Sequence, residues 1–264
     1  MTETSDRLNT TRPHPARVYD FLLGGKDNFE SDREFAAQMI AAYPEAKEAA
    51  LANRAFMRRA VAWMAQHAGI RQFIDLGTGL PTSPNLHQVV QGIAPESAVV
   101  YVDNDPLVLV HARALLVGTP EGATAYVDAD VRDPARILAA AAEVLDLSRP
   151  VGLTSIAVLH YVTDADDAHG IVDRLIAALP SGSCLAITHG THDLVSADRR
   201  ERMEGLWAAS PVKSQVRDKS EVERFFAGLD LVKPGVVPIT EWNVEEEVPE
   251  FTDIAFFGGL AVKP

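Results

Sequence analysis

From residue 73 onwards, short apolar runs alternate with longer segments in which apolar residues recur at helical spacing. The runs are too short for helices and predict buried strands, whereas the segments between them predict amphipathic helices. We expect strands near 73–77, 98–102, 124–128, 153–158 and 183–188, and helices near 84–92, 106–117, 134–145 and 165–179. This alternation predicts a doubly wound, mostly parallel α/β sheet.

Both ends of the chain depart from this alternation. Residues 17–68 are alanine-rich with helical spacing, broken by two glycines and a proline, and predict an N-terminal helical segment. Residues 1–11 are polar and without an apolar period, so we expect a mobile tail. Near the other end, 229–237 and 254–262 have no helix between them and predict a hairpin whose acidic connection, around 241–250, is solvated.

The first predicted strand ends in a glycine turn, FIDLGTGLP over 73–81. Gly77 and Gly79 permit backbone conformations forbidden to other residues and let a ligand lie against the main chain. In an open parallel sheet, ligands bind beyond the carboxyl ends of the strands. Asp103 ends the next strand, where its carboxylate can accept hydrogen bonds from both hydroxyls of a ribose. The sequence therefore predicts a nucleoside-binding crevice.

The residues after the turn indicate which nucleoside this is. Dinucleotide sites hold a pyrophosphate with free backbone amides at a helix start, but Pro81 and Pro84 have no amide hydrogen. We expect Pro84 at the first helical position, with Ser83 as the cap. A ligand with a ribose and no phosphate fits better, and S-adenosylmethionine is the common one.

DLGTG (75–79), Asp103 and YVDADVRDP (126–134) resemble the successive cofactor motifs of class I S-adenosylmethionine-dependent methyltransferases. The segments 12–34, 52–61, 74–82 and 102–116 resemble, more specifically, a bacterial family once listed as a domain of unknown function and now called S-adenosyl methyltransferase. The resemblance spans nearly the whole chain. It implies a Rossmann-like sheet of seven strands with an antiparallel C-terminal strand, and S-adenosylmethionine as the cofactor.

The third motif assigns the adenine end. Asp130 would accept from the adenine amino group, and the backbone amide of Val131 would donate to a ring nitrogen. The alternative is that Asp128, Asp130 and Asp133 cap the helix that begins near Pro134, with Asp133 the best placed of the three.

Asn104 and Asp75 complete the predicted cofactor site. Asp103 could instead only stabilise the turn at the end of the strand, because Asn104 and Asp105 form a helix-start signal. Asn104 is itself predicted to contact the cofactor. Asp75 precedes Gly77 by two residues and would order the glycine turn or receive the methionine ammonium through water. Its alternative is a purely structural acceptor for loop amides.

The fourth strand leads into AVLHYVTDADD (157–167). His160 and Tyr161 are the candidates to touch the methyl acceptor, and His160 could remove a proton from it. Methyl transfer from a sulfonium needs mainly in-line positioning, so a packing histidine is the alternative. His189 and His192 are expected in the loop after the fifth strand, with His189 facing the substrate pocket. Their spacing lacks a third ligand, and we expect no metal.

The segment YDFLLGGKDNF (19–29) contains two glycines inside a helix-forming stretch. An ordinary helix end at Gly24 would explain them. Because the family resemblance is strong here, we predict instead that the segment folds over the cofactor. Arg17 or Lys26 would pair with the cofactor carboxylate, and Tyr19 or Phe29 would line the pocket.

Composition narrows the class of protein further. The net charge is 24 − 37 = −13, which opposes a phosphate backbone and argues against a nucleic-acid substrate. One cysteine, Cys184, excludes an internal disulfide, and no apolar segment of about 18 residues or signal-peptide pattern is present. We expect a cytoplasmic protein without a membrane partner and leave open whether it is a homodimer. At 264 residues, one domain is the default, with 12–68 as a helical cap and 69–264 as the Rossmann-like core.

The sequence thus predicts an S-adenosylmethionine-dependent methyltransferase that acts on a small molecule by direct displacement at the methyl carbon. A non-catalytic protein that binds S-adenosylmethionine or another small metabolite is the main alternative. An NAD(P)-dependent oxidoreductase is a weaker one, because of the prolines after Gly79.

Overall fold

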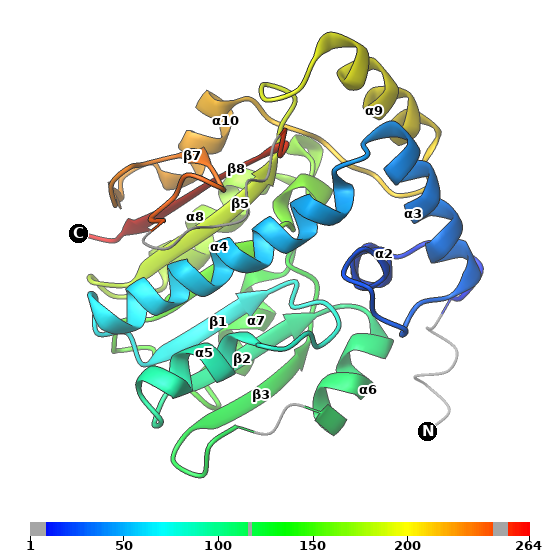
Figure 1. Ribbon diagram of the computed structural model, residues 1–264. Coiled ribbons are helices and arrows are strands. Elements are labelled where there is room, and N and C mark those ends of the chain that lie inside the picture. The colour runs from blue at the N-terminus through cyan, green and yellow to red at the C-terminus, as the bar shows by residue number, and fades with distance from the viewer. Residues whose placement is uncertain (1–8, 116–117, 245–252) are drawn as a thin grey trace.

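The computed structural model describes residues 9–115, 118–244 and 253–264 (Figure 1). The strands are β1 (Gln72–Leu76), β2 (Ala98–Asp103), β3 (Ala123–Asp128), β4 (Gly152–Ile156), β5 (Cys184–Gly190), β6 (Asp230–Leu231), β7 (Val237–Pro238) and β8 (Phe256–Val262). The α-helices are α2 (Pro15–Leu22), α3 (Glu30–Ala42), α4 (Ala46–Gln66), α5 (Leu86–Ile93), α6 (Pro106–Leu115), α7 (Pro134–Ala141), α8 (Ala168–Ala177), α9 (Ala197–Ala209) and α10 (Lys219–Glu223). Short 3₁₀ turns are η1 (Leu159–Tyr161), η2 (Asp164–Asp166) and η3 (Arg224–Phe226). No helix among these residues is long and apolar enough to cross a membrane.

The strands form one sheet in the order β3-β2-β1-β4-β5-β8-β6, with β7 also paired to β8. The first five strands are parallel, and β8 runs antiparallel to β5. This confirms the predicted doubly wound sheet with an antiparallel C-terminal strand. The order reverses at β1, so the carboxyl ends of β1 and β4 flank the crevice where ligands bind in such sheets.

The last strand pair differs in detail from the prediction. The expected strand at 229–237 is two short strands, β6 and β7, which share the edge of β8 that β5 leaves free. Pro234 has no backbone N–H to donate, and Gly235 has a φ of +89°. The chain therefore leaves the sheet between β6 and β7. Of the acidic connection, Glu241 is exposed, while Glu245, Glu246, Glu247 and Glu250 lie outside the described residues, as does most of the predicted tail, 1–8.

Alternating side chains build a core on each face of the sheet. Phe73 and Val99 pack under α4 and α5, whereas Ile74 and Val100 point to the opposite face, toward α7 and α8. All four are fully buried. Strands with both faces buried read as continuous apolar runs, and this explains why the strands were visible in the sequence.

The N-terminal segment contains three helices, separated at the glycine pair and at Pro44 as predicted. In Figure 1, α4 runs across one face of the sheet, and α2, α3 and α9 gather beyond the carboxyl ends of the strands. α2 has Pro15 at its first position, and Ala16 packs against Leu80 of the glycine turn and Val108 of α6. The helices therefore cover the ligand-binding edge of the sheet.

One predicted helix start is wrong. α5 begins at Leu86, and Asn85 is its cap in place of Ser83, with Pro84 outside the helix. The Asn85 amide donates to Oε1 of Gln88 at 2.7 Å, a capping-box contact that fixes the start two residues later than Pro84 suggested.

Candidate active site

A cavity of about 530 Å³ lies at the carboxyl ends of the parallel strands, under α2, α3, α4 and α9. Its volume is within the range of small-molecule sites. One end, called here the nucleoside end, is lined by Asp75, Gly77, Gly79, Asp103, Asn104, Asp130 and Val131. The other, called the apolar end, is lined by Met39, Tyr43, Tyr161, Met203, Trp207 and Phe256. These seven residues, predicted to bind the cofactor, thus line one end of a single cavity.

Asp103 is held by the glycine turn beside it. The Gly79 amide donates to its Oδ2 and the Asp105 amide to its Oδ1, both at 2.9 Å. Gly77 and Gly79 have φ values of +63° and +67°, which explains why glycine occupies both positions. Burial raises the pKa of Asp103, and the two amides oppose this only in part. Each carboxylate oxygen keeps a further acceptor site for a ligand hydroxyl.

Asp130 is oriented by its neighbours. Nδ2 of Asn104 donates to its Oδ2 at 2.8 Å, and the Arg132 amide donates to its Oδ1 at 2.9 Å. Burial would raise the pKa of Asp130, but these hydrogen bonds and the Arg132 charge outweigh it and hold the pKa below its ordinary value. Asp133 is the residue that caps α7, accepting from the Arg136 amide at 3.1 Å. Asp130 is therefore left facing the cavity as an ionised acceptor.

Asp75 lies on β1, beside Thr154 of β4. Its Oδ1 accepts from the Thr154 hydroxyl at 2.6 Å, and burial raises its pKa to about 6, while Thr154 and the Arg54 charge act against the shift. Arg54 also lines the cavity and donates to the carbonyls of Thr82 and Pro84. Sequence reasoning missed Arg54, although it lies in the segment 52–61 that carried part of the family resemblance.

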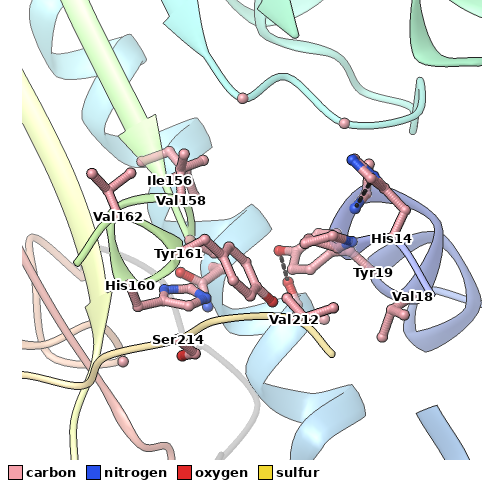
Figure 2. A pocket seen from close by; sticks show the side chains of 18 of the residues that line it. His14, Val18, Tyr19, Ile156, Val158, His160, Tyr161, Val162, Val212 and Ser214 are labelled. Carbon is pink, nitrogen blue, oxygen red and sulfur yellow. Dashed lines mark hydrogen bonds between the residues drawn. The ribbon is translucent and has the colours of Figure 1, made fainter. Parts of the chain in front are cut away.

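His160 and Tyr161 form η1, directly after β4. Figure 2 shows the Tyr161 ring between His160 and Tyr19, and the rings of His160 and Tyr161 are 4.2 Å apart. Nδ1 of His160 is buried without a hydrogen-bond partner among the described residues. Burial lowers the pKa of His160 well below its ordinary value, and His189 and Arg217 lower it further. The imidazole is therefore neutral at physiological pH.

His189 is placed differently from the prediction. It lies within β5, is fully buried and does not line the cavity. Its Nε2 is 2.8 Å from Nη1 of Arg217, which can only donate, so Nδ1 carries the proton and donates to the Gly190 carbonyl at 2.8 Å. Arg217 also donates to the carbonyls of Leu159 and Val162 at 3.2 and 3.0 Å. His189 thus supports the arginine that holds η1 in place.

His192 makes a different contact from His189: its Nδ1 lies 3.3 Å from Oε1 of Glu204. Within 9–115, 118–244 and 253–264, no group of three or more histidine, cysteine or acidic side chains could hold a metal ion.

The cavity can be compared with those of known proteins. The family model described as S-adenosyl methyltransferase matches residues 1–264. The chain belongs to this family. It is therefore an S-adenosylmethionine-dependent methyltransferase, which decides against the oxidoreductase and the non-catalytic binder. A search of curated protein sequences gave no match.

Solved structures agree with the family. A DUF574 family protein from Streptomyces avermitilis MA-4680 is 48% identical, with a TM-score of 0.92, covering 97% of this chain and 99% of that chain. A candidate methyltransferase from Thermobifida fusca YX is 38% identical, with a TM-score of 0.87, covering 97% and 96%. An O-methyltransferase family protein from Burkholderia thailandensis is 12% identical, with a TM-score of 0.51 over 98% of this chain and 66% of that chain, and shares the fold alone.

The residues of the methyltransferase cavity fit S-adenosylmethionine. Asp103 offers acceptors for a ribose, and Asp130 offers one for an amino group. A Cβ on Gly79 would meet no atom within 4 Å, so open space lies beside the turn. The arginines that line this end are already bonded to the protein, Arg54 to the carbonyls of Thr82 and Pro84 and Arg132 to Asp130. The donor set therefore matches a nucleoside without phosphate.

The N-terminal prediction is altered in its details. Arg17 does not line the cavity, because its Nε lies 3.5 Å from both Asp32 and Asp105, which are buried with it. Phe29 lies outside the cavity too, with the Arg17 guanidinium 5.2 Å from its ring centre, and Lys26 does not reach the cavity.

Tyr19 does line the cavity, and its hydroxyl donates to the Ala50 carbonyl at 2.9 Å. With Arg17 and Lys26 outside, Arg54 and His14 are the basic side chains that α4 and the start of α2 bring to the cavity wall.

Proposed function

We propose that this methyltransferase transfers the methyl group of S-adenosylmethionine to a small-molecule acceptor by direct displacement at the methyl carbon. The observation that carries the proposal is that one cavity joins a carboxylate-lined nucleoside end to an apolar end. The first end suits the cofactor, and the second offers space for an acceptor next to it.

The predicted cofactor contacts are part of this proposal. Asp103 accepts from the ribose hydroxyls, while Asp130 and the amide of Val131 meet the adenine edge. Asn104 orients Asp130 through the 2.8 Å hydrogen bond. Asp75 holds the methionine ammonium, directly or through water. Gly77 and Gly79 allow the cofactor to lie against the backbone.

The bound cofactor supplies a methyl group on a positively charged sulfur. His160 and Tyr161 border the acceptor and place its nucleophilic atom in line with that group. Proximity and alignment account for several kcal/mol of the barrier in such reactions, roughly 7–11 in favourable cases. His160 is neutral and can take up the acceptor proton, although its lowered pKa makes it a weak base.

We propose that the whole chain acts as one methyltransferase domain, with 12–68 as the cap over the core at 69–264. Contacts of α4 with α5, β4 and β5 support this organisation. The net charge of −13 supports a small-molecule acceptor over nucleic acid. A cytoplasmic location, the absence of a membrane partner and a homodimer remain parts of the hypothesis.

The proposal is tested by calorimetry with S-adenosylhomocysteine and NAD. The protein is expected to bind S-adenosylhomocysteine and not NAD. Asp103→Ala removes two charge-assisted acceptors worth about 1.5–3 kcal/mol each, so affinity is expected to fall by about one to several powers of ten.

Asp128→Ala is the matched control, because Asp128 is the register partner of Asp103 on β3 and does not line the cavity. An unchanged affinity in a folded Asp103→Ala protein would remove Asp103 from the cofactor site.

A further inference from the structure

We infer that the methyl acceptor is a small, uncharged, flat aromatic molecule that carries a hydroxyl or amine group. The inference rests on the proposed function and specifies the substrate class of the same site. Four properties of the cavity lead to it: its walls, its charges, its unpartnered polar atoms and its size.

The walls are rich in aromatic rings and thioethers. Five aromatic side chains line the cavity, and Met39, Met57 and Met203 are three of the five methionines of the chain. These side chains are Tyr19, Tyr43, Tyr161, Trp207 and Phe256. Aromatic rings prefer stacked or edge-to-face contacts with other rings, and methionine sulfur packs well against aromatic edges.

The rings face the cavity as apolar surfaces. The Tyr19 hydroxyl is taken up by the Ala50 carbonyl, and the Tyr43 hydroxyl donates to the Asp253 carbonyl at 3.0 Å and accepts from the Ala255 amide at 2.9 Å. Trp207 is held edge-on by Phe35 at 5.6 Å and lies 6.2 Å from Tyr161. Two tyrosines and a tryptophan therefore offer fixed ring surfaces to a flat ligand.

The carboxylates of the cavity wall are confined to the nucleoside end. The carboxylates that line the cavity within the described residues are Asp75, Asp103 and Asp130, all at the nucleoside end. Arg54 donates to two backbone carbonyls, Arg132 is paired with Asp130 and Asp166, and Lys213 is exposed at the rim. A cationic acceptor at the apolar end would have no carboxylate beside it, and an anionic one would have to compete for cations that are already bonded, so burying either charge is costly. An uncharged acceptor avoids this cost.

Two polar side-chain atoms at the apolar end have no hydrogen-bond partner among the described residues. The Tyr161 hydroxyl has no hydrogen-bond partner among the described residues, and neither has Nδ1 of the buried His160. In Figure 2 the Tyr161 side chain points into the cavity, toward Tyr19 and Val212. The Tyr161 hydroxyl faces the cavity, so a ligand with a hydroxyl or amine would give it a hydrogen-bond partner.

The same group is the nucleophile. Its oxygen or nitrogen forms a bond to the methyl carbon as the carbon–sulfur bond breaks, and the electron pair of that bond stays on sulfur, which becomes a neutral thioether. The proton of the acceptor leaves to the neutral His160 or to solvent. No further reactant is needed.

The size of the cavity favours a small acceptor. Its volume of about 530 Å³ must hold the cofactor as well, and sites of about 300–1,000 Å³ ordinarily enclose one drug-sized ligand.

The test uses 2-naphthol, the anion of 2-naphthoic acid, and naphthalene as probes. Binding of each is measured by calorimetry to the full-length protein saturated with S-adenosylhomocysteine. We expect 2-naphthol to bind at least about tenfold more tightly than the anion. We also expect incubation with S-adenosylmethionine to give 2-methoxynaphthalene, seen by mass spectrometry.

Two variants locate the binding. Trp207→Ala is expected to lower the affinity for 2-naphthol at least about tenfold. The control is Trp63→Ala, which changes a partly buried tryptophan of α4 outside the cavity and should leave that affinity unchanged. Tyr161→Phe should lower the affinity for 2-naphthol toward the affinity for naphthalene. The affinity for naphthalene itself should stay the same.

Each outcome separates this inference from the proposed function. If S-adenosylhomocysteine binds but the anion binds as tightly as 2-naphthol, the acceptor is charged and the inference is wrong. If S-adenosylhomocysteine binds and 2-naphthol does not, the aromatic class is wrong. If S-adenosylhomocysteine itself does not bind, the proposed function fails, and the inference with it.

Discussion

Individual residues at the nucleoside end show how burial and hydrogen bonding set the state of a carboxylate. Asp130, partly open and bonded to Arg132 and Asn104, has a lowered pKa, whereas the pKa values of Asp75 and Asp103 are raised by burial. The same residue type therefore has opposite shifts within one site. Cofactor binding should depend on pH through the two buried carboxylates.

The pH dependence has a definite sign. The pKa of Asp75 is about 6, so it gains a proton as the pH falls through that value. A methionine ammonium favours the ionised form, so affinity for S-adenosylhomocysteine is complete above about pH 7 and falls up to about tenfold per pH unit below about pH 6. The raised pKa of Asp103 acts in the same direction. Calorimetry measures the ratio of the affinities for S-adenosylhomocysteine at about pH 8 and about pH 5.

The Asp75→Asn variant separates the two carboxylates. It should bind more weakly at about pH 8 and lose part of the ratio between the two pH values, since only Asp103 then titrates. A ratio identical to that of the unmodified protein would show that Asp75 does not interact with the ammonium group.

The two glycines of the turn form a second contrast. Both have positive φ, but a Cβ on Gly77 would lie 2.5 Å from Cγ2 of Val158, whereas one on Gly79 would meet nothing within 4 Å. Gly79→Ala should cost about 1 kcal/mol in the free energy of unfolding, through backbone strain. Gly77→Ala should cost about 1–3 kcal/mol more, because the side chain must also be packed. Urea unfolding measures both, and equal costs would contradict the geometry.

At the scale of elements, a few buried side chains position the short segments that line the cavity after β4. η1 has three residues and cannot hold its own conformation. Arg217 binds it through two backbone carbonyls, is held in turn by His189, and reaches Asp164 of η2 at 2.6 Å. Burial lowers the pKa of His189 to about 3, so the histidine stays a neutral acceptor for the arginine.

Removing this arginine should loosen η1. Arg217→Met removes the donor to the Val162 carbonyl and one of the two donors to the Leu159 carbonyl, which keeps the Val162 amide, and is expected to lower the free energy of unfolding by about 2–4 kcal/mol. Methyl transfer should fall while S-adenosylhomocysteine still binds, because the nucleoside end is untouched. Arg174→Met, which removes an exposed ion pair with Asp167, should cost less than about 1 kcal/mol. Thermal denaturation compares the two, and similar losses would argue against a special role for Arg217.

For the whole molecule, the N-terminal helices and the sheet meet through a buried charge cluster. Arg17 of α2 lies between Asp32 of α3 and Asp105, and the Asp105 amide holds Asp103. The His14 amide donates to the same Asp32 at 2.9 Å. A short chain of contacts therefore joins the N-terminal cap to Asp103, the residue predicted to bind the ribose.

Breaking the cluster should release the cap and weaken the cofactor site together. Arg17→Met leaves Asp32 and Asp105 buried without their cation, so we expect faster hydrogen exchange over α2 and about tenfold weaker binding of S-adenosylhomocysteine. The sheet should keep its protection. Arg33→Met is the control, because Arg33 is exposed and bonds only to Asn28 among the described residues. Slow exchange over α2 in the Arg17 variant would show that apolar packing alone holds the cap.

Sequence by itself determined the sheet and the nucleoside end. Strands buried on both faces appear as continuous apolar runs, and Gly77, Gly79 and Asp103 follow those runs directly, so local order along the chain placed them at one edge. The same logic failed for His189, which lies inside β5, and for the broken strand at 229–237.

Only the tertiary structure decided which side chains line the apolar end of the cavity. Tyr43 follows the end of α3, while Trp207 and Phe256 come from α9 and β8, far away in the chain, and no local pattern brings them together. It also decided that Arg17 pairs with two buried carboxylates while Arg54 lines the cavity. The physical reason is that a partner for a charge or a ring is chosen by packing in space, whereas strands and turns follow from neighbours in sequence.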